Sequence, residues 1–289
     1  MTTPVLATGL SGLVGTRIRD LLAGRFDFED LSLTTNINIT DSSQVQEAFE
    51  NSKAQVVLHM AAKTDVDACE DDKQFGEEGG AWQVNVLGTE NIAFAAGNTG
   101  KRIIYISTDF VFDGTKEFYS ENDKPNPVSW YGYTKFLGEQ KLLESDVDVT
   151  ILRISYPYRN RNNVRNDFVH RLIDVMAKDK KVYGLTDHIF TPTFIDDIAK
   201  ALADFLTRNL PGIYHLVGSS SLPTIEAVKL IRDTYHLKAE IIPIDRKTYF
   251  KDRAFRPFKL ALKNDKIQKL GLKMLTFKQG LKEIKIQDS

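Results

Sequence analysis

Hydrophobic residues in the first half of the chain alternate between short continuous runs and stretches with helical spacing. The short runs predict buried strands, and the stretches between them predict helices. Strands are expected at 4–8, 31–35, 55–60, 102–107 and 149–154. Helices are expected from residue 13, after the N-cap residue Asp41, and over 84–96 and 133–143. Apolar strands that alternate with helices are typical of a parallel sheet covered on both faces.

The pattern loosens after about residue 155, where residues 156–166 are polar, basic and rich in asparagine. Helical spacing returns at 168–177, 195–206 and 225–235, and short strands are expected at 213–217 and 240–243. We therefore predict an α/β protein with a doubly wound parallel sheet in residues 1–155. Residues 156–289 are expected to form mostly a smaller substrate-binding lobe, with some segments returning to the core of the first unit.

A glycine-rich segment, TGLSGLVG at 8–15, lies between the first predicted strand and the first predicted helix. Gly9 suits a turn with positive φ, and Gly12 lets the backbone approach a pyrophosphate. Gly15 allows close packing of the helix on the strand, and the helix N-terminus attracts the anion. In this context the loop predicts dinucleotide binding and a Rossmann-like sheet.

The end of the second predicted strand bears on the choice of dinucleotide. NAD enzymes place an acidic residue there to hold the ribose 2′-hydroxyl. The strand expected at 31–35 carries no carboxylate, and Asp30 precedes it. This leans towards NADP(H) over NAD(H). Arg17 is either a ligand of the additional phosphate or a solvated helix residue.

A second motif, YGYTK at 131–135, contains a tyrosine and a lysine four residues apart, which share one face of a helix. A nearby ammonium lowers the pKa of a tyrosine, and a tyrosine tuned in this way exchanges protons with a carbonyl or an alcohol. Upstream, Thr108 follows the strand expected at 102–107, at the edge where open α/β sheets bind ligands. Thr108, Tyr131 and Lys135 therefore form a candidate catalytic set.

The order of TGLSGLVG, STDFVFDG and YGYTK resembles the extended short-chain dehydrogenase/reductase family, in its dTDP-4-dehydrorhamnose reductase branch. The resemblance runs nearly end to end and includes blocks at 59–70, 84–93, 191–202 and 212–218 and the pair Arg256-Pro257. Phe110 follows the Thr-Asp pair, where family epimerases and dehydratases often carry an acidic residue, and this favours the reductase branch.

The resemblance implies roles for individual residues. Tyr131 would protonate the C4 oxygen of a 4-keto sugar, Lys135 would bind the nicotinamide ribose and tune Tyr131, and Thr108 would orient the keto group. The implied cofactor-binding residues are Gly9, Ser11, Gly12, Leu13, Val14, Gly15, Arg17, Asn38, Ile39, Ala61, Ala62, Thr64, Asn85, Tyr131 and Lys135. The implied substrate-binding residues are Thr108, Asp109, Val66, Tyr156 and Arg256.

The chain departs from the family pattern where the sugar-nucleotide pocket is expected. The family tryptophan after the fifth strand is Tyr156 here, and a basic loop replaces the following glycine. Arginine side chains match phosphate geometry, so this region predicts either a diphosphate site or a solvated loop. The basic residues concerned are Arg159, Arg161, Arg165 and Lys259.

Composition narrows the classes of function. The net charge of −1 gives no electrostatic reason to expect nucleic acid or a membrane as partner. Cys69 has no second cysteine to pair with, and the five histidines lack metal-ligand spacing, so we expect no metal site. The N-terminus lacks the layout of a secretory signal and no apolar stretch is long enough to span a bilayer, so a cytoplasmic protein is expected.

The leading hypothesis is an NAD(P)H-dependent reductase of a nucleotide-activated 4-keto-6-deoxy sugar. A second hypothesis is a dinucleotide-binding regulatory subunit, like the β subunit of methionine adenosyltransferase. A third is a sugar-nucleotide epimerase or dehydratase. The nucleotide, the sugar and the assembly, for which a homodimer is one option, stay open.

Overall fold

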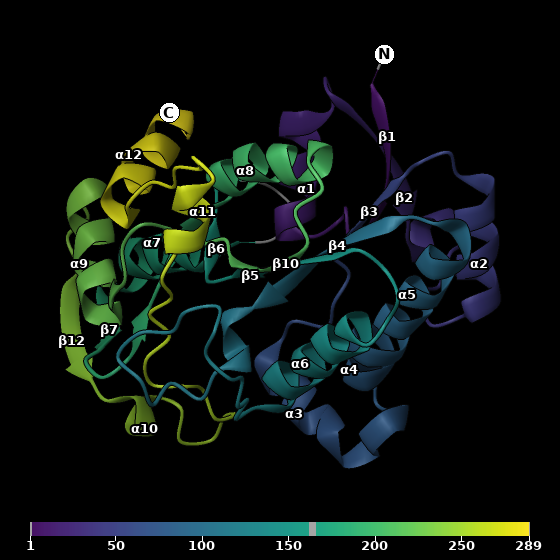
Figure 1. Ribbon diagram of the computed structural model, residues 1–289. Coiled ribbons are helices and arrows are strands. Elements are labelled where there is room, and N and C mark those ends of the chain that lie inside the picture. Colours follow the sequence, from purple (N-terminus) through teal and green to yellow (C-terminus); the bar gives the residue numbers. More distant parts are fainter. Residues whose placement is uncertain (1, 162–165, 289) are drawn as a thin grey trace.

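The computed structural model describes residues 2–161 and 166–288. Its centre is a six-stranded parallel sheet in the order β10-β5-β4-β3-β1-β2 (Figure 1). The strands are β1 (Thr3–Thr8), β2 (Phe26–Leu31), β3 (Val56–His59), β4 (Arg102–Thr108), β5 (Val149–Ile154) and β10 (Gly212–His215). The predicted Rossmann-like α/β class is confirmed. Strand β1 lies between β2 and β3, so the chain runs from β1 to β2 on one side and then crosses back to β3 on the other side. Such a switch point opens a crevice at the carboxyl ends of the strands.

Helices cover both faces of this sheet (Figure 1). On one face lie α1 (Leu13–Leu22) and α8 (Ile195–Thr207), whose apolar residues share a core with β1, β3 and β4. On the other lie α2 (Ser42–Asn51), α5 (Gly88–Thr99) and α6 (Trp130–Leu143). The short helices α3 (Val66–Asp72) and α4 (Gly80–Trp82) precede α5, which continues from a turn of π-helix over Gln83–Leu87.

The second strand lies earlier than the hydrophobic pattern predicts. The expected strand at 31–35 is wrong: β2 spans Phe26–Leu31, and Leu33–Thr35 form a 3-10 turn. The reason is that β2 is an edge strand that pairs only with β1, so its sequence FDFEDL alternates instead of being continuously apolar. This shift moves Asp30 to the carboxyl end of the strand.

The second half of the chain builds a lobe beside the sheet and also returns to it. The helices α7 (Phe168–Asp179), α9 (Thr224–Thr234) and α12 (Phe277–Gln287) share an apolar core with the strand pair β7 (Lys181–Leu185) and β12 (Glu240–Ile244). The shorter elements are β6 (Pro157–Tyr158), β8 (Ile189–Phe190), β9 (Thr193–Phe194), β11 (Leu222–Pro223), α10 (Arg246–Tyr249) and α11 (Asp265–Lys269). Within the two described ranges, no helix has the length and hydrophobicity needed to cross a membrane.

Candidate active site

The glycine-rich loop has a backbone that only glycine accepts at its first position. Gly9 adopts φ +72°, and a Cβ there would lie 2.7 Å from the backbone nitrogen of Ala61. A Cβ on Gly15 would lie 2.3 Å from the carbonyl oxygen of Gly9. Gly12 caps α1 without a side-chain hydrogen bond, and Leu13 and Val14 form the first helical turn. This cradle, with the exposed Ser11 at its tip, fits the pyrophosphate of a dinucleotide.

An acidic side chain does lie at the end of the second strand. Asp30 pairs in register with Ala7 of β1, next to the glycine-rich loop. One carboxylate oxygen accepts a hydrogen bond of 2.9 Å from Ser32 Oγ, and the other is buried and has no partner in the described part of the chain. The premise that led to NADP(H), a second strand that ends without a carboxylate, is therefore wrong, because β2 ends at Leu31, directly after Asp30.

Arg17 has a carboxylate partner in the structure, so it is not the solvated helix residue that was one of its two predicted roles. Its guanidinium forms two hydrogen bonds of 2.6 Å with the carboxylate of Asp196 in the first turn of α8, and a third of 2.8 Å with Gln287. Arg17 thus joins α1 to α8 and α12. Its fork is already matched by a carboxylate, which explains why it does not reach towards β2.

Two residues expected against adenine lie beyond β2. Asn38 is exposed, and its side-chain oxygen accepts a hydrogen bond of 3.1 Å from the backbone of Thr40. Ile39 is buried and packs against Gly88 at the start of α5. The Asn38 amide nitrogen has no partner among residues 2–161 and 166–288, so it is available to a base edge.

The carboxyl ends of β1 and β3 are tied together next to this cradle. Thr8 Oγ1 accepts hydrogen bonds from the backbone nitrogens of Met60 and Ala61 and contacts His59 Nδ1 at 2.7 Å. Burial lowers the pKa of His59 to about 3, with a smaller contribution from the Lys135 charge. His59 is thus a neutral core residue that fixes the sheet edge.

Asn85 connects the segment after β3 to α6. The Asn85 side chain is fully buried, accepts a hydrogen bond of 2.9 Å from Lys63 N and donates one of 3.0 Å to Thr134 Oγ1. The half-buried Ala61 and Ala62 and the exposed Thr64 lie on the segment that Asn85 holds. These contacts fix the position of the segment that lies between the glycine-rich loop and α6.

Thr108 and Tyr131 meet at the carboxyl end of β4. Thr108 ends the strand, and Tyr131 lies in the first turn of α6, where Ser129 caps the helix by accepting a hydrogen bond from Gly132 N. The ring of Phe110 packs edge-on against Tyr131, and the nearby Thr108 hydroxyl opposes part of the rise in the Tyr131 pKa that burial causes. Burial raises the pKa of Tyr131, so the phenol is protonated at neutral pH.

Lys135 is oriented differently from the expectation. Its ammonium donates a hydrogen bond of 2.9 Å to the carbonyl oxygen of Ile106 and lies 3.9 Å from the centre of the Tyr105 ring. Burial lowers its pKa to about 7, opposed by the charge of Glu139. The expected lowering of the Tyr131 pKa by Lys135 is not seen in this arrangement, because the ammonium is bound to the β4 backbone.

A buried ion pair that the sequence analysis missed supports this region. Arg153 of β5 donates hydrogen bonds of 2.9 and 2.6 Å to the carboxylate of Glu139 on α6, and both side chains are 1% exposed. Ser107 Oγ donates a further one to Glu139. The sequence signal for this pair was that Glu139 lies four residues after Lys135 and therefore on the same face of α6.

Three of the residues expected to bind substrate, Val66, Tyr156 and Arg256, lie in a second region. Tyr156 adopts φ +40°, and its hydroxyl lies 3.3 Å from His188 Nε2. Arg256 donates hydrogen bonds of 2.9 and 2.8 Å to Asp67, next to Val66 at the start of α3. A backbone held at positive φ in a tyrosine is strained, which marks the position as one that the surrounding fold imposes.

Arg246, which the sequence analysis did not select, completes this region. It is 4% exposed, and its guanidinium lies 3.5 Å from the centre of the Phe258 ring. Its Nε is buried without a hydrogen-bond partner in the two described ranges. Burial lowers the pKa of His188 to about 3, helped by the charges of Arg246 and Arg256. Arginines alternating with aromatic residues over 246–258 were the available signal.

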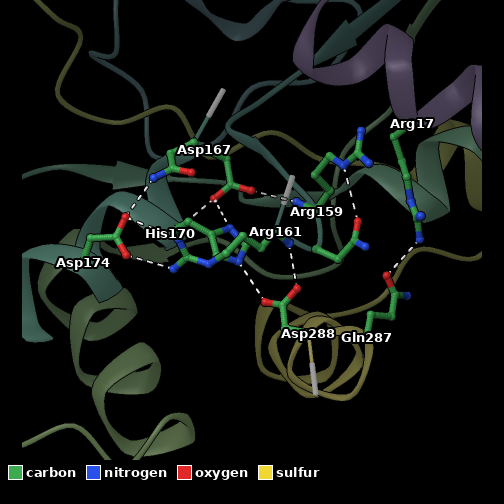
Figure 2. A network of polar contacts seen from close by, with 10 residues as sticks. Arg17, Arg159, Arg161, Asp167, His170, Asp174, Gln287 and Asp288 are labelled. Atoms are coloured by element: carbon green, nitrogen blue, oxygen red, sulfur yellow. Dashed lines mark hydrogen bonds and ion pairs between the residues drawn. The ribbon is translucent and has the colours of Figure 1, made fainter. Parts of the chain in front are cut away.

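In the described part of the basic loop, Arg159 and Arg161 are held by neighbouring side chains (Figure 2). The Arg159 guanidinium reaches α1, where it donates a hydrogen bond of 2.9 Å to Thr16 Oγ1, and Arg161 pairs with Asp174 at 2.9 Å. Asp167 and Asp288 accept hydrogen bonds from the backbone nitrogens of Arg159 and Arg161. Arg165 lies outside the described residues. Arg159 and Arg161 thus have protein partners, and the alternatives of a diphosphate site and a solvated loop stay predictions.

Taken together, the site pairs a dinucleotide cradle with a buried phenol and hydroxyl at one sheet edge. In the part of the chain that the structure describes, no three His, Cys, Asp or Glu residues are grouped so as to hold a metal ion. Fold and site define a dinucleotide-binding protein of the extended short-chain dehydrogenase/reductase type. The family model described as RmlD substrate binding domain matches residues 2–288, and the chain belongs to this family.

Individual relatives agree with this assignment. The chain is 33% identical over 223 residues to a dTDP-4-dehydrorhamnose reductase of Aggregatibacter actinomycetemcomitans, covering 74% of this chain and 73% of that protein. It is 30% identical over 256 residues to methionine adenosyltransferase 2 subunit beta of Bos taurus, covering 86% and 74%. A crystal structure of dTDP-4-dehydrorhamnose reductase from Bacillus anthracis str. Ames in complex with NADP has a TM-score of 0.90 at 27% identity, covering 99% and 100%.

Proposed function

We propose that this protein is an NAD(P)H-dependent reductase of a nucleotide-activated 4-keto-6-deoxy sugar. The observation that carries the proposal is that the buried Thr108 and Tyr131 lie at the end of β4 and the start of α6, at the same sheet edge as the glycine-rich loop. Relatives named as dTDP-4-dehydrorhamnose reductases support it at the level of the family. We also propose that residues 1–155 bind the dinucleotide and that residues 156–289 supply most of the substrate lobe.

The proposed chemistry assigns one task to each hydroxyl. A bound reduced nicotinamide supplies the hydride to C4. Thr108 would turn its single O–H from Asp109 Oδ1 to the C4 carbonyl and so orient it, and Tyr131 gives its proton to the C4 oxygen. The raised pKa of Tyr131 keeps this proton in place until the oxygen becomes basic. Lys135 would bind the nicotinamide ribose through the N–H bonds that it does not donate to the Ile106 carbonyl oxygen.

The nucleotide end of the substrate is proposed to lie over the second region. Arg246 gives it positive charge, whereas the Arg256 guanidinium is paired with Asp67, and the rings of Phe258 and Tyr156 give it aromatic surface. An open cleft of about 500 Å³ beside Phe258 is lined by Gly114, Thr186, Asp187, Ile189 and Lys259. Guanidinium groups and aromatic faces are what a nucleoside diphosphate requires.

The test supplies the protein with a panel of 4-keto-6-deoxy sugars linked to dTDP, UDP or GDP. Turnover is measured as the oxidation of NADH or NADPH. Tyr131→Phe should abolish turnover, because it removes the transferred proton. Tyr133→Phe is the matched control on the same helix, since that tyrosine is 39% exposed and outside the site. Oxidation that continues unchanged in Tyr131→Phe would overturn the proposed mechanism.

We further propose that Asp30 accepts the ribose 2′-hydroxyl and that the chain binds NAD(H) more tightly than NADP(H). The unpartnered buried oxygen of Asp30 supports this, and so does the pairing of Arg17 with Asp196. No Lys or Arg occurs between Leu31 and Asp41, where a 2′-phosphate would lie. The preference therefore differs from the one that the strand expected at 31–35 suggested.

A second candidate is a regulatory subunit that binds dinucleotide without turning over a sugar. It is favoured by the methionine adenosyltransferase 2 subunit beta relatives, which match 86% of this chain. Stoichiometric capture of an enzyme partner, with no turnover on the whole panel, would favour this candidate. Product analysis would distinguish a reductase from an epimerase or dehydratase, because only a reductase consumes a reduced nicotinamide in proportion to product.

A further inference from the structure

A buried arginine from the second half of the chain lies against the helix that follows the glycine-rich loop. Arg159 comes directly after β6 and is 4% exposed. Its Nη1 donates a hydrogen bond of 2.9 Å to Thr16 Oγ1 and a longer one of 3.5 Å to the carbonyl oxygen of Leu13. Both residues belong to the start of α1. A cation from a distant segment therefore touches the helix whose N-terminus faces the proposed dinucleotide.

Thr16 carries this contact on to the glycine-rich loop. Its hydroxyl donates a hydrogen bond of 2.9 Å to the carbonyl oxygen of Gly12, and its backbone nitrogen donates one of 3.0 Å to the same oxygen. Because a hydroxyl group has one proton to give, Thr16 Oγ1 meets Arg159 as an acceptor. Gly12 caps α1 without a side chain of its own. Thr16 and Arg159 therefore brace the residue at which the backbone approaches a pyrophosphate.

The charge of Arg159 is not matched by a close carboxylate. In the two described ranges its ion-pair partner is Asp20, whose Oδ2 lies 3.7 Å away and whose side chain is 54% exposed. The neighbouring Arg17, by contrast, forms two hydrogen bonds of 2.6 Å with Asp196. A buried cation without a tight partner is costly, and a nearby anion offsets this cost. An anion bound one helical turn away, at Gly12, supplies that charge.

We propose that Arg159 is a positioning residue for the dinucleotide, which holds Gly12 through Thr16 and adds positive charge behind the pyrophosphate. The inference rests on the proposed dinucleotide site. It assigns the first arginine of the basic loop to the pyrophosphate of the cofactor and not to the diphosphate of a sugar nucleotide. It also makes cofactor affinity depend on the segment that begins the substrate lobe.

The contacts of the loop favour this role over simple anchoring. The backbone nitrogen of Arg159 already donates a hydrogen bond of 2.9 Å to Asp167, and β6 pairs with β9 immediately before it. The loop is thus attached to its own lobe without the guanidinium. Arg161 shows the alternative, since its half-exposed guanidinium pairs with Asp174 of α7. Arg161 is therefore the matched control on the same loop.

The experiment titrates wild type and variants with NADH and with ADP-ribose, which keeps the pyrophosphate and lacks the nicotinamide. Arg159→Met should raise both Kd values by about 10-fold and flatten their dependence on salt, because a screened charge is lost. Arg159→Lys keeps the charge and should stay within about 3-fold of wild type. Arg161→Met should bind like wild type. KM for the sugar nucleotide at saturating NADH should be unchanged in all of them.

Thr16→Val tests whether Arg159 acts through the hydroxyl. It should also raise the Kd for NADH, and the double variant with Arg159→Met should bind more tightly than the product of the two single effects predicts. Multiplying effects would overturn the link between the two side chains. Urea unfolding of each variant without ligand checks that the fold is intact.

The remaining outcomes separate this inference from the proposed function. Tight NADH binding by wild type with an unchanged Kd in Arg159→Met would overturn the role of Arg159 and leave the reductase standing. A raised Kd with the salt dependence of wild type and no rescue by Arg159→Lys would also overturn it, because that pattern belongs to a packing defect. A wild type that binds no NADH and turns over no sugar on the panel would overturn the proposed function and this inference together.

Discussion

Asp30 offers the most decisive perturbation of the cofactor site. Asp30→Ala removes the carboxylate that lies beside the glycine-rich loop, and Asp30→Asn keeps the hydrogen-bonding shape while removing the charge. Asp27→Ala is the matched control, since Asp27 lies three residues earlier on the same strand and is exposed. The three variants separate the charge of Asp30 from its hydrogen bonds and from general effects on β2.

The expected magnitudes follow from the local contacts. A hydrogen bond to a charged group contributes about 1.5–3 kcal/mol, so its loss in Asp30→Ala should weaken NADH binding by about 10- to 100-fold. A 2′-phosphate about 4 Å from the carboxylate is repelled by about 1–4 kcal/mol per charge pair, depending on the effective dielectric constant. Wild type should therefore bind NADH at least about 10-fold more tightly than NADPH. Asp30→Asn should lose most of this preference.

The assay is direct titration of each protein with NADH and NADPH by calorimetry or nicotinamide fluorescence, without a sugar substrate. The account predicts a preference for NADH in wild type and Asp27→Ala, and little preference in Asp30→Ala. Equal binding of both cofactors by wild type, with no change in Asp30→Ala, would refute the assignment of Asp30 to the ribose.

Three further perturbations test the cradle, the buried ion pair and the C-terminal helix. Gly9→Ala should abolish NADH binding in the same titration, because a Cβ would meet the Ala61 backbone, whereas Gly24→Ala, with open space around it, should bind normally. Arg153→Met should lower the urea unfolding free energy by about 3–5 kcal/mol by leaving Glu139 buried and unpaired, and adding Glu139→Leu should restore much of it. Burial opposes protonation of His170, but Asp167 and Asp288 raise its pKa overall. Protonated His170 therefore stabilises the fold below its unfolded pKa of about 6.5, and this stabilisation is lost as the pH rises through the raised pKa of the folded state. His170→Gln should remove this contribution from the pH dependence of the unfolding free energy.

The hydrophobic pattern predicted the central strands because they are continuously apolar. The strands β1, β3, β4 and β5 lie where short runs of Val, Ile and Leu occur, and Asp41 caps α2 through two backbone nitrogens as its residue type suggests. The pattern did not predict the position of the edge strand β2, because this strand carries charged residues between its apolar ones. The α6 helix begins at Trp130 rather than 133, because Ser129 provides the cap one turn before the apolar pattern starts.

The candidate site was predictable where a motif is local and not where partners are distant. Gly9, Thr108 and Tyr131 lie in short motifs, and the fold brings them to one sheet edge. The partner of Arg17 is 179 residues away at Asp196, and no local pattern announces such a pair. The cluster around Arg246 likewise depends on how α10 and the following loop fold back against Tyr156 and His188.

The central claim is that a hydride reaches C4 of a sugar nucleotide while Tyr131 supplies the proton. The most direct measurement follows the reaction of a 4-keto-6-deoxy sugar nucleotide with nicotinamide deuterated at its transferable position, and locates deuterium in the product by NMR. The account predicts one deuterium at C4 of the product with wild type and none with Tyr131→Phe. Product that carries deuterium elsewhere, or C4 deuteration that persists undiminished in Tyr131→Phe, would contradict it.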